Sequence, residues 1–415
     1  AAADAPPPVA AAPRPYSPWR TLVPRYWTPL AAAADGGGTL LGAGTSAHDV
    51  LGRHAYSARL LGNVRTGDVE GDAAYRLTRW ARPFVDVTAS QAWQYDTVAV
   101  RTPGGGPAQE VALDRRSRVV GAGLAFARPR YRTSAALSVG ASWETRDYRS
   151  PLAALAGRAD SLLGASFPTL SLAGSWGNTR RPLRSVSPED GVSLSFTAQH
   201  RWQDGAGAAD GASRRVVGVA RAYKSLDLPG FAHHVLALRV AGGATDRRAS
   251  TEFGAGGTSG SSALLLPGVT VGDPARTFGV RGFAAGAQRG IRAAAASAEY
   301  RAPLLLPARG LDLLPAFLDR VSLSAFADAG SAWCPRDVDR AVQTLCRRTA
   351  DGASNLAVSP DAPRWLASVG AELNLDAALQ YDQGYRLRVG VAAPVRERAR
   401  AGRAASVYGT LGLSF

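Results

Sequence analysis

Alternation of apolar and polar residues, repeated in segment after segment, is the feature that most constrains the fold of this chain. The last ten residues, SVYGTLGLSF, place Val407, Leu411 and Leu413 on one face and Thr410 and Ser414 on the other. That period of two belongs to a β-strand whose faces meet different surroundings. Polar side chains at every second position would be costly in a dry core but cost little when they face a wet lumen.

The same pattern predicts sixteen strands. They lie near residues 21–29, 38–48, 54–64, 70–80, 84–100, 117–128, 134–147, 167–176, 192–202, 215–225, 234–243, 291–302, 321–333, 365–375, 386–392 and 406–415. An even number keeps both ends of a single-chain bacterial barrel on one side of the membrane. The chain has no run of 18 apolar residues and no long helical period. We therefore expect an all-β fold, a 16-stranded antiparallel transmembrane β-barrel over residues 16–415, in the bacterial outer membrane.

The connections between these strands sort by length. If the last strand ends in the periplasm, the short connections 50–53, 80–83, 128–132 and 381–385 are periplasmic, with 177–190 and 304–320 as longer exceptions. The long connections 102–115, 149–166 and 244–290 then lie outside the cell. This division matches barrels, which have short periplasmic turns and long extracellular loops.

The first predicted strand is the weakest, because Pro24 and Pro29 each remove a backbone donor. A weak first strand implies a weak seam with the last strand. Residues 1–15, AAADAPPPVAAAPRP, are too rich in Pro and Ala to form a core and are expected to be an extended linker. With no initiator Met and no signal-peptide pattern, the chain is interpreted as a mature or excised segment.

The net charge of +15 comes almost wholly from arginine, since Lys224 is the only lysine. Such a balance fits nucleic acid, anionic lipid or a GC-rich genome. The arginines are dispersed and no nucleic-acid-binding motif accompanies them, so we expect no nucleic-acid partner. Cys334 and Cys346 lie in a polar loop without metal-ligand spacing and are predicted to form a disulfide in an oxidising compartment.

Catalytic and cofactor motifs do not emerge from the sequence. The histidines His48, His54, His200, His233 and His234 are scattered and form no HExxH pattern. The stretch TSGSS lacks the GxSxG frame, and GAGGTSG lacks the lysine of a phosphate-binding loop. We expect no enzyme, no metal and no cofactor, and keep an outer-membrane hydrolase as the least favoured alternative.

Four motifs at the end of the chain resemble a known family. FGVRGF (278–283), SAEYRAPL (297–304), FADAGSAW (326–333) and the terminal GTLGLSF occur in the order seen in the bacterial surface antigen superfamily. That superfamily includes the BamA/TamA class of outer-membrane insertases and translocators. The resemblance is specific over 276–415, and over 21–275 it rests on strand number and connection lengths.

The resemblance implies a site. The sixth extracellular loop would fold into the lumen, where Arg281 would be held by Glu299 and Asp328. Gly279 and Gly282 would allow a tight turn, Phe283 would pack on the lumen wall, and Gly330 completes the strand motif. A last group, Tyr408, Leu411, Leu413 and Phe415, would be the C-terminal assembly signal.

The resemblance also implies a function: insertion or translocation of polypeptides, or of lipid, through the weak seam. Expected partners are outer-membrane lipid and lipopolysaccharide, client polypeptides, and a periplasmic module such as POTRA domains that this chain lacks. A passive porin-like channel whose basic lumen favours anions is the alternative.

Overall fold

The computed structural model describes residues 16–34, 38–79, 82–100, 109–149, 165–202, 204, 213–246, 253–260, 263–266, 269–271, 275–311, 314–335, 359–360, 363–379 and 383–413. The linker predicted for residues 1–15, Cys346 and Phe415 lie outside these ranges.

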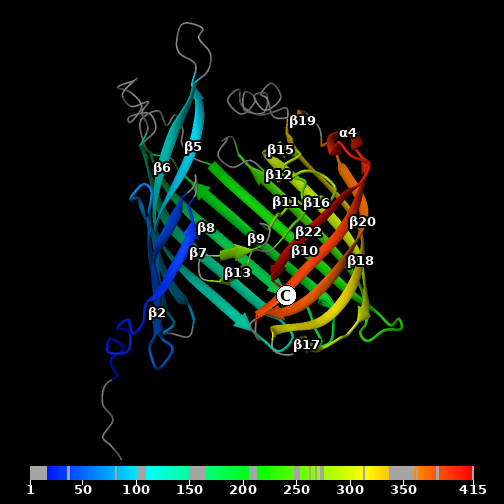
Figure 1. Ribbon diagram of the computed structural model, residues 1–415, viewed down its shortest axis with the longest axis horizontal. Coiled ribbons are helices and arrows are strands. Elements are labelled where there is room, and N and C mark those ends of the chain that lie inside the picture. The colour runs from blue at the N-terminus through cyan, green and yellow to red at the C-terminus, as the bar shows by residue number, and fades with distance from the viewer. Residues whose placement is uncertain are drawn as a thin grey trace, which may run out of the picture.

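Sixteen strands of the described residues form one curved antiparallel wall (Figure 1). They are β1 (Thr28–Ala33), β2 (Thr39–His48), β3 (His54–Asn63), β4 (Val69–Leu77), β5 (Phe84–Val100), β6 (Gln109–Pro129), β7 (Ser134–Arg149), β8 (Ala165–Gly177), β9 (Gly191–Arg201), β10 (Ser213–Leu226), β11 (His234–Thr245), β16 (Arg292–Leu305), β18 (Leu314–Cys334), β20 (Leu366–Leu379), β21 (Gln383–Arg396) and β22 (Ser406–Leu413). The short strands β17 (Arg309–Leu311) and β19 (Ser359–Pro360) add to β18. The prediction of a 16-stranded all-β barrel wall is confirmed.

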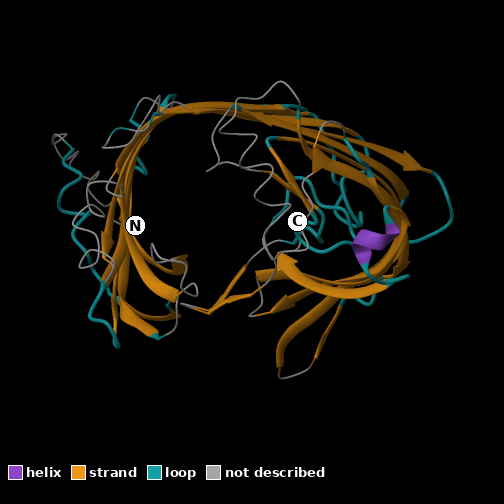
Figure 2. Cartoon of the chain, turned by 90° about the horizontal axis from the view of Figure 1, so that it is seen from above, coloured by secondary structure: helices purple, strands orange, loops and turns teal. Residues whose placement is uncertain are grey.

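Each wall strand pairs with its neighbours along the chain, apart from the two end strands. Among the described residues, β1 pairs only with β2 and β22 only with β21, so no hydrogen-bonded ladder joins the first strand to the last. Seen from above, the wall bends through most of a ring (Figure 2). The described residues contain one short helix, α4 (Arg398–Ala401). None of them forms a helix long and apolar enough to cross a lipid bilayer.

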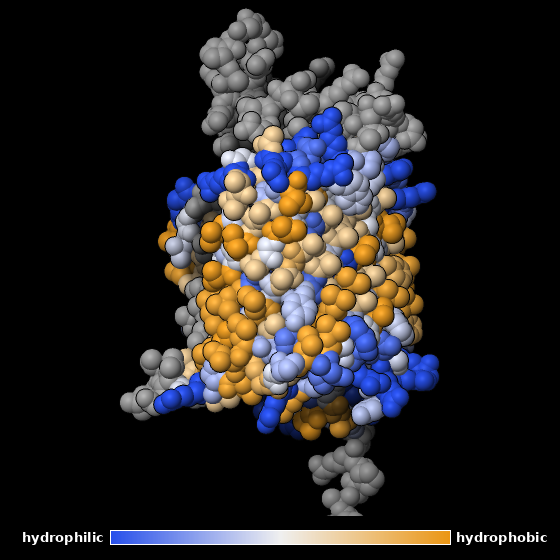
Figure 3. All heavy atoms as spheres, turned by 90° about the vertical axis from the view of Figure 1, so that its right-hand side faces the viewer, coloured by the Kyte–Doolittle hydropathy of each residue, from blue (hydrophilic) through white to orange (hydrophobic). Residues whose placement is uncertain are grey.

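The two faces of the wall differ as the alternation predicts. On β9, the outward side chains of Val192, Leu194 and Phe196 are exposed, while Ser193 and Ser195 point inward. Across the surface shown in Figure 3, apolar residues gather in a band between hydrophilic rims. The outer band faces hydrocarbon, and the polar inner face lines the lumen.

The first strand differs from its prediction. Residues 18–22 form a turn, in which the amides of Thr21 and Leu22 donate to the carbonyl of Pro18, and β1 begins only at Thr28. The prediction of a strand over 21–29 is therefore wrong by several residues. Alternation of apolar residues alone did not reveal the turn. Pro29 is tolerated within β1 because this strand pairs on one side only.

The connection between β11 and β16 folds into the barrel. Its strands β12 (Phe253–Ala255) and β15 (Gln288–Gly290) pair with each other, and β13 (Ala263–Leu266) pairs with β14 (Val269–Val271). Figure 2 shows loops inside one half of the ring. A small apolar core forms between this connection and the wall, from Phe253, Phe278, Val280, Phe283 and Ala287 of the connection against Ala241, Ala293, Ala295, Ala332 and Leu366 of the wall. Alanine and glycine on the wall leave the room that the loop fills.

A second insertion enters from the end of the barrel where β22 finishes. In the β8–β9 turn, residues 178–190, the side chains of Ser185, Val186 and Ser187 are buried. Arg386 of β21 donates to the carbonyl of Val186 at 3.0 Å, and Arg320 of β18 donates to that of Ser185. This turn, predicted as one of the two longer periplasmic connections, thus reaches across the lumen opening to the opposite wall.

Orientation of the wall can be tested by placing arginine on either face of β9. Leu194→Arg puts a charge in the lipid-facing band, where such a change costs about 2–4 kcal/mol near the bilayer midplane. Thr197→Arg is the matched control, because Thr197 is exposed at an inward position of the same strand. Urea unfolding in lipid vesicles measures both. Equal losses would contradict the assigned faces.

The β8–β9 turn should loosen with rising pH. The hydrogen bond that His233 Nδ1 donates to Glu189 Oε2 at 2.9 Å, together with the negative charges of Glu189, Asp227 and Asp190, raises the pKa of His233. Stability from a raised histidine pKa is complete below the unfolded value of about 6.5 and is lost as pH rises through the folded value.

Hydrogen exchange of the amides of residues 185–190 other than Pro188, corrected for intrinsic rates, is expected to show more protection at about pH 5.5 than at about pH 8.5. His233→Gln should abolish that difference, whereas the control His48→Gln should preserve it. A pH difference that survives His233→Gln would assign the effect to another group.

Candidate functional site

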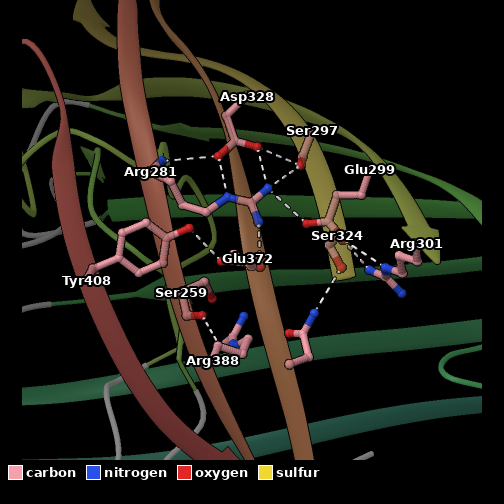
Figure 4. Close-up of polar contacts among 11 residues, drawn as sticks. Ser259, Arg281, Ser297, Glu299, Arg301, Ser324, Asp328, Glu372, Arg388 and Tyr408 are labelled. Atoms are coloured by element: carbon pink, nitrogen blue, oxygen red, sulfur yellow. Dashed lines mark hydrogen bonds and ion pairs between the residues drawn. The ribbon is translucent and has the colours of Figure 1, made fainter. Parts of the chain in front are cut away.

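The buried guanidinium of Arg281 is the centre of the polar contacts inside the barrel (Figure 4). Arg281 lies on the β11–β16 connection and is 8% exposed. Its partners come from three neighbouring wall strands, β16, β18 and β20. They face it because each occupies an inward position of its strand.

Asp328 of β18 is the principal partner. Its Oδ2 accepts from the Arg281 backbone amide at 3.1 Å and from Nε at 2.7 Å, while Oδ1 accepts from Nη2 at 2.7 Å. Ser297 of β16 donates to the same Oδ1 at 2.7 Å. The two parallel side-chain bonds form the bidentate arrangement that favours arginine over lysine.

Two glutamates complete the charge around Arg281. Glu299 of β16 lies 2.9 Å from Nη2, and Glu372 of β20 lies 3.1 Å from Nη1. Glu299 also pairs with Arg301 at 2.6 Å. The Arg281 guanidinium stacks 3.5 Å from the ring centroid of Phe326, which adds a cation–π contact.

The contacts extend to the last strand. Tyr408 of β22 donates to Oε1 of Glu372 at 2.7 Å. Gly390 lies between them on β21, and a Cβ there would come within 2.8 Å of both side chains. The network therefore runs from the inserted loop across β20 to β22 with no described break.

Glycines bring the loop close to the wall. Gly282 has a φ of +89°, which only glycine adopts readily. At Gly330, a Cβ would stand 2.6 Å from Cγ2 of Val280, so this position must stay small for the loop to dock. Gly279 has no positive φ; a Cβ there would approach the carbonyl oxygen of Gly257 to 3.1 Å. The tight turn expected at both Gly279 and Gly282 is thus present only at Gly282.

Two further arginines hold the loop through its backbone. Arg239 of β11 donates to the carbonyl of Thr277 at 2.6 Å, and Arg388 of β21 donates to that of Ser259 at 2.6 Å. Gln288 donates to the carbonyl of Arg364 at 2.8 Å and accepts from the amide of Ala332. The loop is therefore attached at several separate points.

The structure brings Arg281, Glu299 and Asp328 together, and buries Phe283 in the loop core. Sequence reasoning missed Glu372, Ser297 and the position of Tyr408 as a partner of Glu372. Each lies at an inward position of a predicted strand, so the alternation pattern could have marked all three as facing the lumen. The pattern does not predict the register of the strands, and the register decides which inward side chains contact Arg281.

Other predicted residues lie apart from this network. Cys334 ends β18 and is buried, but its expected partner Cys346 is outside the described residues, so the disulfide stays a prediction. Leu411 and Leu413 belong to β22. In the part of the chain that the structure describes, no three His, Cys, Asp or Glu side chains gather as metal ligands would.

Chemically, the site is a set of fixed charges that hold a loop. One cation faces three carboxylates, which are themselves held by Ser297, Arg301 and Tyr408. The hydroxyl groups of Ser297 and Tyr408 donate to carboxylates that also bind Arg281. The network joins the loop to four strands.

Comparison with solved structures shows the same fold. The chain is similar to BamA from Haemophilus ducreyi lacking POTRA domains 1–3, with a TM-score of 0.51 and 15% identity over 92% of this chain and 69% of that chain. It is also similar to CdiB from Escherichia coli, with a TM-score of 0.50 and 13% identity over 97% of this chain and 64% of that chain. No curated protein matches the chain in sequence.

A family model, described as the Omp85 superfamily domain, matches residues 81–415. That range includes the inserted loop, all of its carboxylate partners and the last strand. It leaves out β1 to β4, whereas the structural similarities cover 92% and 97% of the chain. The match confirms the family resemblance drawn from the C-terminal motifs. The chain is a bacterial outer-membrane β-barrel and belongs to the Omp85 superfamily.

Proposed function

We propose that this barrel assists the insertion or translocation of polypeptides, or of lipid, at the outer membrane through the seam between β1 and β22. The observation that carries the proposal is that each of these strands has a ladder on one side only among the described residues. An unpaired strand edge presents backbone donors and acceptors that another strand can complete.

The strands at the seam are short. β1 has 6 residues and contains Pro29, and β22 has 8, whereas the neighbouring β21 has 14. A short edge strand with a missing donor offers few hydrogen bonds for closure. Hydrocarbon leaves no water to satisfy the remaining groups, so a client strand entering there would gain bonds that the barrel lacks.

The Arg281 network is proposed as a latch that sets the geometry of the seam. It links the inserted loop to β16, β18 and β20, and through Glu372 and Tyr408 to β22. Because β22 forms one side of the seam, a change in loop position would reach it through two contacts. The latch is thus a positioning element and takes no part in bond making.

The partners of this function are proposed from the relatives. BamA carries POTRA domains, as the name of its structure states, and this chain spans 69% of that protein and 64% of CdiB. We expect client polypeptides and outer-membrane lipid, including lipopolysaccharide, to contact the barrel. A periplasmic module would deliver the client.

The porin alternative has less support. The family match favours insertion or translocation over passive conduction, and the inserted loop occupies part of the lumen. A non-enzymatic role is proposed on the same ground, since the buried charges hold a loop and are already paired with one another.

Crosslinking the seam tests the function. Ala32→Cys and Ser406→Cys, at inward positions near the extracellular ends of β1 and β22, are joined by a bismaleimide, and the barrel is reconstituted in proteoliposomes. An unfolded eight-stranded outer-membrane barrel is then added and its folding rate measured. Without crosslinking, we expect folding about tenfold faster than in empty vesicles, equivalent to a barrier lower by about 1.4 kcal/mol.

The crosslink should remove this acceleration. Ser57→Cys with Ala74→Cys is the matched control, because these residues are already opposite each other on β3 and β4. Full acceleration by the crosslinked seam would refute the proposed route. Large, stable anion currents without any acceleration would favour the porin.

Removing Arg281 tests the latch. Arg281→Ala leaves three carboxylates together without their cation, and breaking a buried pair in this way costs about 3–5 kcal/mol. Asp328→Asn should cost less, because Glu299 and Glu372 still neutralise Arg281. Denaturant unfolding and the rate of trypsin cleavage within the loop measure both changes. Arg289→Ala, at an exposed loop position, is the control.

A charge swap provides the sharper comparison. Arg281→Glu should accelerate loop cleavage strongly, and the added Asp328→Arg should restore part of the protection. If Arg281→Glu leaves cleavage unchanged, the pairing does not hold the loop.

A further inference from the structure

A cavity of about 450 Å³ remains inside the barrel between the inserted loop and the wall. Val186 of the β8–β9 turn borders it, as do Ser259 and Arg276 of the loop. The wall contributes side chains from β10, β11, β16, β18, β20, β21 and β22. It thus lies beside the Arg281 network, whose residues form only part of its lining.

Positive charge exceeds negative charge around this cavity. Seven arginines line it, Arg221, Arg239, Arg276, Arg281, Arg301, Arg386 and Arg388, against three carboxylates, Glu299, Asp328 and Glu372. All three carboxylates contact Arg281, and Glu299 also forms an ion pair with Arg301. Arg386 has its own partner in Asp376, at 2.6 Å.

Four of the seven arginines have no carboxylate partner among the described residues. They are Arg221, Arg239, Arg276 and Arg388. Arg239 and Arg388 each donate one bond to a loop carbonyl, which is neutral. Because a guanidinium has five N–H donors, most of their donors remain available to a ligand.

Two of these arginines are placed against each other. Arg221 of β10 and Arg239 of β11 are direct cross-strand partners on the inner face. Like charges in this position destabilise a sheet, and a lumen partly closed to water screens them less than bulk solvent does. An anion between them would convert the repulsion into two favourable contacts.

From this geometry we infer that the cavity is a binding site for a phosphate monoester, with Arg221, Arg239 and Arg388 as its main ligands. Guanidinium groups arriving from separate strands suit a tetrahedral dianion, which accepts bidentate bonds on several sides. The volume corresponds to roughly 15 liquid waters, much more than a bare phosphate fills. The remaining space would hold a polar group esterified to it, supplied either by a lipid headgroup or by a soluble phosphate ester.

This site goes beyond the proposed function, since it requires neither the seam nor a client. It is tested by titrating the purified barrel, in a non-ionic detergent and phosphate-free buffer, with glycerol 3-phosphate and with inorganic phosphate in a calorimeter. We expect binding of both that weakens with added salt. Arg221→Gln should weaken it at least about tenfold, because the variant loses a charge-assisted contact with the phosphate.

Arg130→Gln is the matched control, because it removes the same charge at an exposed turn outside the cavity. Arg221→Lys keeps the charge but loses the bidentate fork, and should fall between wild type and Arg221→Gln. Circular dichroism establishes that each variant is folded. If Arg221→Gln does not fold, Arg221→Lys alone provides the test, with unchanged affinity as the contrary result.

Native mass spectrometry of the barrel extracted from membranes identifies the source of the phosphate. Phosphatidic acid or a lipid A fragment, each of which carries a phosphate monoester, retained by wild type and lost in the Arg221 variant assigns a lipid headgroup. Binding of glycerol 3-phosphate with no retained lipid assigns a soluble ester. No retained lipid and no calorimetric binding, or equal weakening by Arg130→Gln, would overturn the proposed site.

Discussion

Backbone hydrogen bonding in hydrocarbon is the constraint on which the rest of this structure depends. Every amide in the lipid-facing band needs a partner from a neighbouring strand, because no water is present to replace it. Between β1 and β22, each described wall strand finds these partners on its neighbours. The outer edges of β1 and β22 have no such neighbour among the described residues. We therefore propose that the function resides at these two edges.

Inside the lumen, the inserted loop is held without a large apolar core. Small wall residues such as Ala293, Ala295 and Gly330 leave space, and Phe278 and Val280 fill it. Charge then fixes the position that apolar packing alone would leave loose. Arg281 meets carboxylates from three strands, so one position of the loop pairs this guanidinium with all three of them.

Basic residues inside the barrel have two roles. Arg281, Arg320 and Arg386 bind carboxylates or loop carbonyls, and so attach both insertions to the wall. Arg221 and Arg239 are opposite each other without a described carboxylate partner, an arrangement that favours a bound anion. The net charge of the chain is therefore partly structural and partly available for ligands.

Alternation along the chain determined the architecture. It gave the number of wall strands, their apolar outer face and the inward positions of Glu299 and Asp328, because a strand assigns its faces by parity alone. The C-terminal motifs added Arg281 as their partner through family resemblance. Parity also marked Glu372 as inward, but could not say what it would meet.

Only the tertiary structure decided the contacts that depend on register and loop path. The start of β1 at Thr28, the entry of Val186 into the lumen and the opposition of Arg221 to Arg239 required the strands to be aligned in space. Local pattern specifies which way a side chain points. It does not specify which residue, tens or hundreds of positions away, a neighbouring strand or loop will bring opposite it.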